Sequence, residues 1–190
     1  RLQNDTDLLT YLTIFQDSQD INIQNIIAGI ETSLHIYCLS EQGKGGNKER
    51  IAYFKENFDK IIKHSNGKTP KVFVKMGSQH LGRQKSSLGF KDIGNHLIKT
   101  ADSLGKSSLH IRYMNRFYKG KDNLNNKAWK SAYNFIAVGK EEQWTLIDLR
   151  PIRQMLIDKS LSVTNYELLE IANYDFIVIP PADDWVRKHY

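Results

Sequence analysis

The hydrophobic positions in the first third of the chain recur with a period close to 3.6 residues, which is typical of amphipathic helices. One helix is predicted over residues 6 to 16, and a second follows a stripe from Ile23 to Tyr37. A third stripe from Ile51 to Ile62 comes after the glycine-rich stretch "GKGG" at 43 to 46. Asn47 is suited to cap this third helix, and the pair Asn66-Gly67 is suited to end it.

After Pro70 the apolar residues begin to alternate with polar ones, which is the pattern of a strand. Residues 72 to 76 predict the first strand, and "SSLHIRYM" at 107 to 114 predicts the next. Residues 133 to 138 and 144 to 149 predict two more. The stretch "DFIVIPP" predicts a buried strand that is closed by prolines.

Helix signals lie between these strands. A helix is predicted from about Lys91 to Leu104, and Pro151 suits the first turn of a short one. Thr164 and Glu167 form a capping-box pair ahead of another. The succession of strands and helices predicts an α/β fold: a mainly parallel sheet flanked by helices, with a helical N-terminal segment.

The length of 190 residues fits a single α/β domain or the C-terminal portion of a larger one. Within it, residues 1–66 form the predicted helical segment and residues 67–190 the strand-helix core. The chain opens with Arg1 and shows no signal-peptide pattern. We therefore expect it to be a processed or trimmed portion of a longer protein.

The composition is that of a soluble globular protein, with 40% hydrophobic and 25% charged residues. No run of eighteen apolar residues occurs, so no membrane span is predicted. The formal charge of +6 is compatible with nucleic acid, with an anionic substrate, or with neither. Cys38 is the single cysteine, which excludes an intrachain disulfide and a cysteine-rich metal site. Neither the compartment nor the oligomeric state can be predicted.

The segment from 112 to 130 mixes basic with aromatic residues, a combination that binds single-stranded nucleic acid in some proteins. Such a stretch is more often a solvated loop with aromatic anchors. A small-molecule substrate or ligand is therefore the expected partner, and nucleic acid is not.

His80 is the strongest candidate for chemistry. It lies four residues beyond the predicted strand 72–76, and α/β sheets gather ligands beyond the carboxyl ends of their strands. A histidine can act as a general base near neutral pH, with Lys75, Arg83 or Gln79 holding a substrate or an oxyanion. The alternative is that His80 only makes a hydrogen bond within its loop.

The other histidines do not form a metal-binding pattern. None shows the HxH, HxxH or HExxH spacing, so neither a metal nor another cofactor is predicted. His110 could point into a site or onto a covering helix. Asp148 and Arg150 could support a site from the end of a strand, or could simply cap it.

Three consecutive stretches together resemble the later half of erythromycin esterase-like proteins. They are "NKERIAYFKENFDKII", "KVFVKMGSQHLGR" and "LGFKDIGNHLIKTADSLGKSSLHI". His80 matches the second histidine of the family's strand-end motif, and Gly77 and Ser78 stand where that motif has histidine and asparagine. Arg50 and Glu56 fit the family's helix. The resemblance covers about residues 47 to 114, and "YDFIVIP" more loosely.

This resemblance implies an α/β hydrolase in which histidine and glutamate activate water without a metal. His80 would be the general base, or would orient the water that attacks an ester or related carbonyl. Arg50, Glu56 and His110 would not contact the substrate themselves but would hold the residues that do.

The same resemblance leaves a second function open. Related proteins include an iron-regulated haem-binding lipoprotein group, so the scaffold is also compatible with a non-catalytic module that binds haem or another small ligand. His80, His110 or Tyr113 would then contact the ligand.

Overall fold

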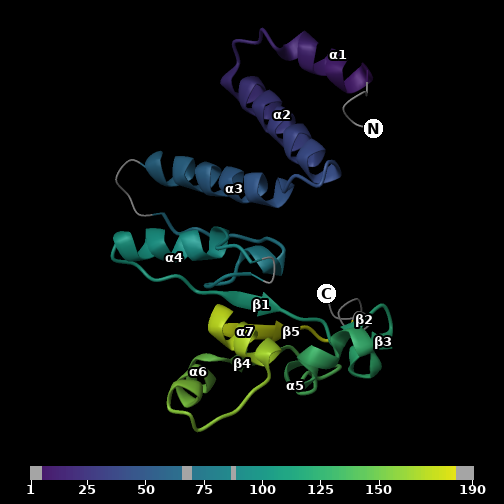
Figure 1. The fold of residues 1–190 in the computed structure, drawn as a ribbon, viewed down its shortest axis with the longest axis vertical. Coiled ribbons are helices and arrows are strands. Elements are labelled where there is room, and N and C mark those ends of the chain that lie inside the picture. Colours follow the sequence, from purple (N-terminus) through teal and green to yellow (C-terminus); the bar gives the residue numbers. More distant parts are fainter. Residues whose placement is uncertain (1–5, 66–69, 87–88, 183–190) are drawn as a thin grey trace. The chain divides into compact units, whose positions relative to one another are not determined.

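The computed structural model describes residues 6–65, 70–86 and 89–182. Its internal contacts divide the chain into two compact units, Arg1–Lys68 and Thr69–Tyr190. In the described part, the first unit is helical, whereas the second combines helices with short strands (Figure 1).

The first unit contains the three helices that the apolar periodicity predicts: α1 (Thr6–Phe15), α2 (Ile21–Glu41) and α3 (Gly46–Lys63). The predicted cap of the third is wrong. Gly45, with a left-handed φ of 86°, precedes α3, and Asn47 lies inside its first turn. The helix ends at Lys63, and the predicted stop at residues 66 and 67 falls outside the described residues.

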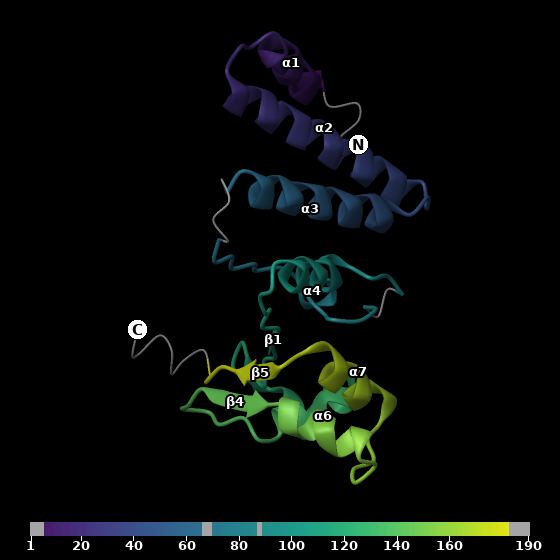
Figure 2. The ribbon, with the colours of Figure 1, turned by 90° about the vertical axis from the view of Figure 1, so that its left-hand side faces the viewer.

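Helices α2 and α3 form an antiparallel hairpin (Figure 2). They lie in close contact at Gly46, where an added Cβ would lie 2.1 Å from the Ser40 Oγ and 2.5 Å from the Ile36 carbonyl oxygen. Ile36, Ile51 and Phe58 are buried along the hairpin. The apolar stripes of the two helices therefore face each other, as their periodicity requires.

The second unit holds a three-stranded sheet in the order β1 (Ile111–Tyr113), β5 (Phe176–Ile179), β4 (Thr145–Asp148). Strand β1 runs parallel to β5, but β4 runs antiparallel to it. A separate hairpin pairs β2 (Phe117–Tyr118) with β3 (Lys121–Asp122). The prediction of a mainly parallel sheet flanked by helices is therefore wrong, because the described sheets are small and one of the two strand pairs in the main sheet is antiparallel.

Two of the predicted strands are not strands. Residues 70 to 77 have no regular structure, and Phe73 within them is 88% exposed. Alternation makes a segment suitable for a sheet, but a strand also needs a neighbour that accepts and donates its backbone hydrogen bonds. Residues Tyr133–Ile136 form the short helix α5 instead, since a brief apolar run fits either structure.

The remaining helices of this unit agree with their sequence signals. They are α4 (Ile93–Ser103), α6 (Arg150–Ile157) and α7 (Asn165–Asn173). Pro151 lies in the first turn of α6, and the Thr164–Glu167 capping box precedes and opens α7, as predicted. Short 3₁₀ turns cover Ser78–His80, Asn123–Asn125 and Lys127–Ala132.

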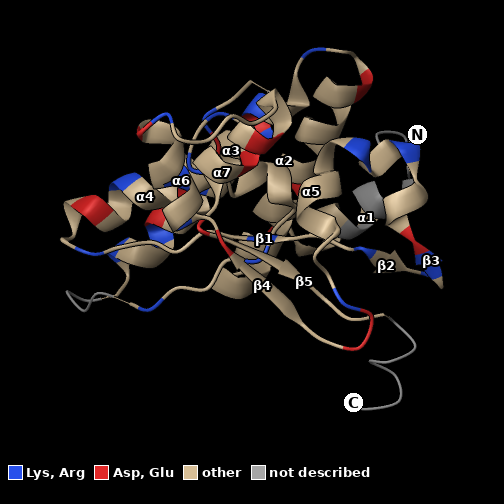
Figure 3. Ribbon diagram, turned by 90° about the horizontal axis from the view of Figure 1, so that it is seen from below, with Lys and Arg blue, Asp and Glu red and all other residues tan. Residues whose placement is uncertain are grey.

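Helices α5 and α7 cover one face of the main sheet (Figure 3). Ile177 and Ile179 of β5 are fully buried there, against Ile136 and Ile171. The opposite face carries Ile111, Tyr113 and Leu146, all exposed. A sheet that is covered on only one face is typical of sheets with antiparallel strands, because wholly parallel sheets are usually covered on both faces.

The capping box gives a direct test of how α7 is held. Thr164 Oγ1 accepts from the Glu167 amide at 3.3 Å, and Glu167 Oε2 accepts from the Thr164 amide at 2.7 Å. Thr164→Ala should lower the free energy of unfolding by about 1 kcal/mol, because the helix loses a side-chain cap. Urea denaturation measures this. Ser162→Ala, exposed just before the helix, is the control, and an equal loss in both variants would contradict the capping role.

Candidate functional site

His80 is held by a buried carboxylate. It ends the 3₁₀ turn Ser78–His80, where its amide donates to the Gly77 carbonyl at 3.0 Å. Its Nδ1 lies 2.8 Å from Asp92 Oδ2. The His80 side chain is 18% exposed and that of Asp92 only 1%. The imidazole therefore reaches the surface, while the group that orients it is inside.

Asp92 is fixed by its position at the start of α4. Its Oδ1 accepts from the Ile93 amide at 2.6 Å as the helix cap, which leaves Oδ2 for His80. An ionised Asp92 can only accept, so the neutral imidazole carries its proton on Nδ1 and its lone pair on Nε2. This is the tautomer that a histidine needs to take a proton through Nε2.

The first turn of α4 lies directly against the backbone that follows His80. A Cβ added at Gly94 would lie 2.4 Å from the Leu81 carbonyl carbon and 2.5 Å from the Gly82 oxygen. A Cβ at Gly82 would in turn lie 2.6 Å from Asn173 Oδ1. Two glycines are thus required by close approach, and they keep the His80 segment between α4 and the end of α7.

Two buried side chains hold carbonyls on either side of His80. The Tyr174 hydroxyl donates to the Ser78 carbonyl at 2.5 Å, and His110 Nδ1 donates to the Leu81 carbonyl at 2.7 Å. Burial raises the pKa of Tyr174 to about 12, so its hydroxyl keeps the proton that it donates. The backbone of the turn is therefore anchored at both of its ends.

His110 is an internal residue, only 4% exposed. Its second ring nitrogen, Nε2, lies 3.0 Å from the Ser108 hydroxyl, so both nitrogens are engaged within the protein. Burial lowers the pKa of His110, the bond to Leu81 opposes that shift, and the nearby Arg83 cation adds to it. The ring supports the turn and does not face a ligand.

Asp175 binds groups from three parts of the unit. Its Oδ2 accepts from Arg83 Nη2 at 2.5 Å and from the His110 amide at 2.9 Å, and Arg153 Nη1 lies 3.5 Å from its Oδ1. Burial acts to raise the pKa of Asp175, but these donors outweigh it and lower the pKa overall. Arg83 also donates to the Ser108 carbonyl at 3.0 Å. The Nη2 group of Arg83 is therefore bound within the protein.

We call His80, Arg83, Asp92, His110 and Asp175 the edge cluster. His110 directly precedes β1 and Asp175 directly precedes β5, so the cluster lies at the amino ends of the two parallel strands. The carboxyl end of the antiparallel β4 meets the same edge, where the Leu149 amide donates to the Asp175 carbonyl at 2.8 Å. The expected place of His80 beyond the carboxyl end of a strand is therefore wrong, since the described residues 70 to 77 before its turn form no strand.

The other residues singled out in the sequence are not members of the edge cluster. Lys75 and Gln79 are exposed on the segment that leads to His80. Arg50 and Glu56 belong to α3 in the first unit, where Glu56 pairs with Lys60 at 2.8 Å. Asp148 and Arg150 form a surface ion pair with each other at 2.7 Å.

Sequence reasoning missed Asp92, Asp175 and Tyr174. Asp92 could have been found, because an aspartate just before an apolar helical stripe is a capping signal. Asp175 and Tyr174 stand ahead of the buried strand that the pattern does reveal. Nothing in their spacing indicates that they bind Arg83 and Ser78, more than ninety positions earlier in the chain.

A second buried ion pair lies on the covered face of the sheet. Arg112 Nε is 3.4 Å from Glu170 Oε2, and the Arg112 guanidinium lies over the Tyr174 ring at 5.6 Å. Burial raises the pKa of Glu170, and the charge of Arg112 opposes the shift. This pair contacts Tyr174 from the side of the core.

Within the ranges that the structure describes, no group of three histidine, cysteine or acidic side chains is arranged to hold a metal ion. Over the same ranges, every helix is too short or too polar to cross a bilayer.

Comparison with known proteins adds no further constraint. No protein-family model matches the chain, and no curated protein or solved structure matches it either.

The buried His110 predicts a specific pH dependence of stability. The pKa of His110 is lowered in the folded protein, so on acidification the unfolded chain takes up this proton first. The free energy of unfolding should therefore fall as the pH drops below about 6.5, the ordinary value for histidine, and level off below the lowered pKa.

His110→Asn tests this, because its amide can still donate to the Leu81 carbonyl but cannot titrate. Urea denaturation between neutral and mildly acid pH should give a flatter profile for the variant. Asp175 affects the free energy of unfolding only at more acid pH. Its pKa is lowered in the folded protein, so the stability that its ionised form provides is lost as the pH falls through that lowered pKa. Parallel profiles for variant and wild type would contradict the assignment.

Proposed function

We propose that the chain is a metal-independent hydrolase in which His80 is the general base. The observation that carries the proposal is the 2.8 Å contact of a partly exposed His80 with a carboxylate that is itself buried. A histidine whose ring is oriented by a carboxylate can act as a general base. The resemblance of residues 47 to 114 to erythromycin esterase-like proteins supports the same chemistry.

In the proposed reaction, His80 Nε2 takes a proton from water as the water oxygen attacks the carbonyl carbon of an ester. The tetrahedral intermediate then collapses with cleavage of the bond from the carbonyl carbon to the alkoxy oxygen. Imidazolium returns the proton to the leaving alkoxide, giving a carboxylic acid and an alcohol. Asp92 keeps Nδ1 protonated and stabilises the imidazolium without taking its proton.

The surroundings of His80 assign different roles to its neighbours. Arg83 is bound by Asp175 and by the Ser108 carbonyl, so we assign it to holding the turn rather than to binding an oxyanion. Lys75 and Gln79 are exposed on the segment leading to His80 and are the candidates for substrate contact. The proposed substrate is a small ester or a related carbonyl compound.

Hydrolysis of p-nitrophenyl acetate and butyrate by the chain tests the proposal. The rate should exceed that of free imidazole at the same concentration. His80→Gln should lower kcat/KM by about 100-fold or more, which is the usual size of a general-base contribution. His64→Gln removes an exposed histidine from the other unit and should leave the rate unchanged.

Asp92→Asn separates catalysis from folding. Asparagine can still cap α4 through its oxygen, but its amide then faces His80 Nδ1 and favours the tautomer without a lone pair on Nε2. We expect at least about a tenfold loss of kcat/KM with little change in the urea midpoint. Absence of activity in the wild type, or equal rates in all variants, would overturn the proposal.

A further inference from the structure

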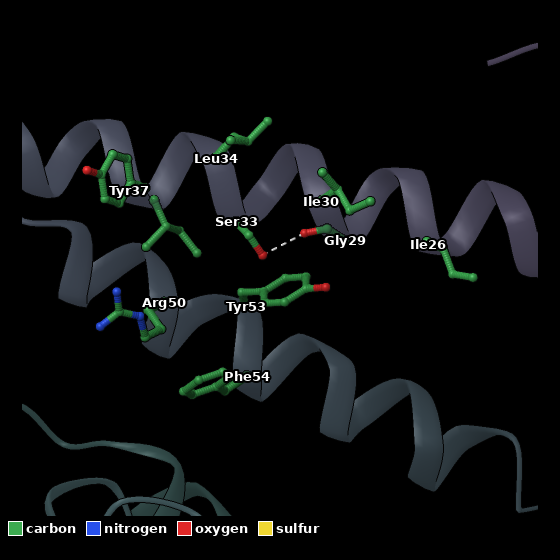
Figure 4. Close-up of a pocket in the computed structure, with 10 residues that line it drawn as sticks. Ile26, Gly29, Ile30, Ser33, Leu34, Tyr37, Arg50, Tyr53 and Phe54 are labelled. Carbon is green, nitrogen blue, oxygen red and sulfur yellow. Dashed lines mark hydrogen bonds between the residues drawn. The ribbon is translucent and has the colours of Figure 1, made fainter. Parts of the chain in front are cut away.

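A groove runs between α2 and α3 in the first unit, with a volume of about 530 Å³. Its walls are mainly apolar and are formed by Ile26, Ile30, Leu34 and Phe54, among others. Figure 4 shows Arg50 near Tyr37 at one end of the groove and Ile26 at the other. The volume is in the range of small-molecule sites in proteins.

Two glycines give the groove its shape. Gly46, one turn before Arg50, lets the helices approach closely, because a Cβ there would meet Ser40 and the Ile36 carbonyl. Gly29 has no side chain at the middle of the α2 wall, and a Cβ added there would lie 3.4 Å from the Tyr53 hydroxyl oxygen. The space opposite Tyr53 is therefore open because Gly29 has no side chain to fill it.

Among the described residues that line the groove, Arg50 carries the only charge. Its Nη1 donates to Asn47 Oδ1 at 3.1 Å, and no carboxylate of the described residues forms an ion pair with it. Glu49, the adjacent acid on α3, is exposed. A half-buried guanidinium at one end of an apolar groove is complementary to an anion that carries an apolar tail.

We propose that this groove binds a free long-chain carboxylate, with the carboxylate on Arg50 and the chain extending along α2 toward Ile26. The distance from Tyr37 to Ile26 is eleven helical steps, about 16 Å at 1.5 Å per residue. An extended chain advances roughly 1.2 Å per bond, so the groove matches a carboxylate of about twelve to fourteen carbons. The proposal does not involve His80 and is independent of the proposed hydrolase activity.

The headgroup and the tail make separate contributions, and each can be removed alone. Arg50→Gln removes the charge and leaves a shorter polar side chain whose amide can still donate a hydrogen bond. Gly29→Leu fills the groove opposite Tyr53, and it exchanges glycine for a better helix former, so α2 should remain intact. Lys48→Gln and Ala28→Leu, both at exposed positions of the same helices, are the matched controls.

The experiment is displacement of a dansyl-undecanoate probe from the full chain by dodecanoate, dodecanol and dodecyltrimethylammonium, each below its micelle concentration. Dodecanoate should compete at least about tenfold better than the other two, as expected for one charge-assisted contact. Arg50→Gln should remove that preference. Gly29→Leu should weaken all binding by at least about tenfold, and both controls should behave as wild type.

Three outcomes would overturn the proposal. The first is no displacement by dodecanoate, and the second is equal competition by all three ligands with no effect of Arg50→Gln. The third is binding only to anionic phosphatidylglycerol vesicles, which would mean that the groove between α2 and α3 binds a lipid surface rather than a free carboxylate. Far-UV circular dichroism checks that each variant keeps its helices, and Arg50→Gln remains a test if Gly29→Leu does not fold.

Discussion

The second unit depends on the buried carboxylate of Asp175. This group binds the Arg83 guanidinium and the His110 amide, and it lies 3.5 Å from Arg153. It thereby joins the segment after His80, the start of β1 and helix α6 to the start of β5. Burying a carboxylate costs free energy unless donors replace its water, and here they come from elements far apart in sequence. Losing Arg83 would remove the cation that lies nearest to this buried carboxylate.

This arrangement explains how a turn without a sheet partner can hold the His80 side chain in place. The Ser78–His80 turn gains no support from strand pairing, because the residues before it form no strand. Its carbonyls are instead bound by Tyr174 and His110, and its imidazole by Asp92. Rigid support of this kind is what general-base chemistry requires, since a base must be held within hydrogen-bond reach of the proton it removes.

The two units differ in how far local pattern determines them. In the first, the 3.6-residue stripes predict α1, α2 and α3, because a helix completes its hydrogen bonds within its own segment. In the second, alternation at 72–76 and at 107–114 looks alike, yet only the latter contributes a strand, β1. Strand formation and direction depend on a partner, and β4 shows that the partner can run either way.

The same division applies to the candidate site. His80 can be recognised in the sequence as a histidine between glycines. The pair Thr164 and Glu167 likewise predicts the start of α7 from local sequence alone. Arg83 is equally visible, but only the folded chain shows that its charge is taken up by Asp175, ninety-two positions away. By itself, the sequence determined helices α1, α2, α3, α4, α6 and α7, the capping box of Thr164 and Glu167, and the presence of a candidate base. The tertiary structure alone decided the sheet order, the carboxylate that orients His80, and which cations are neutralised, because each depends on contacts between residues that no local pattern relates.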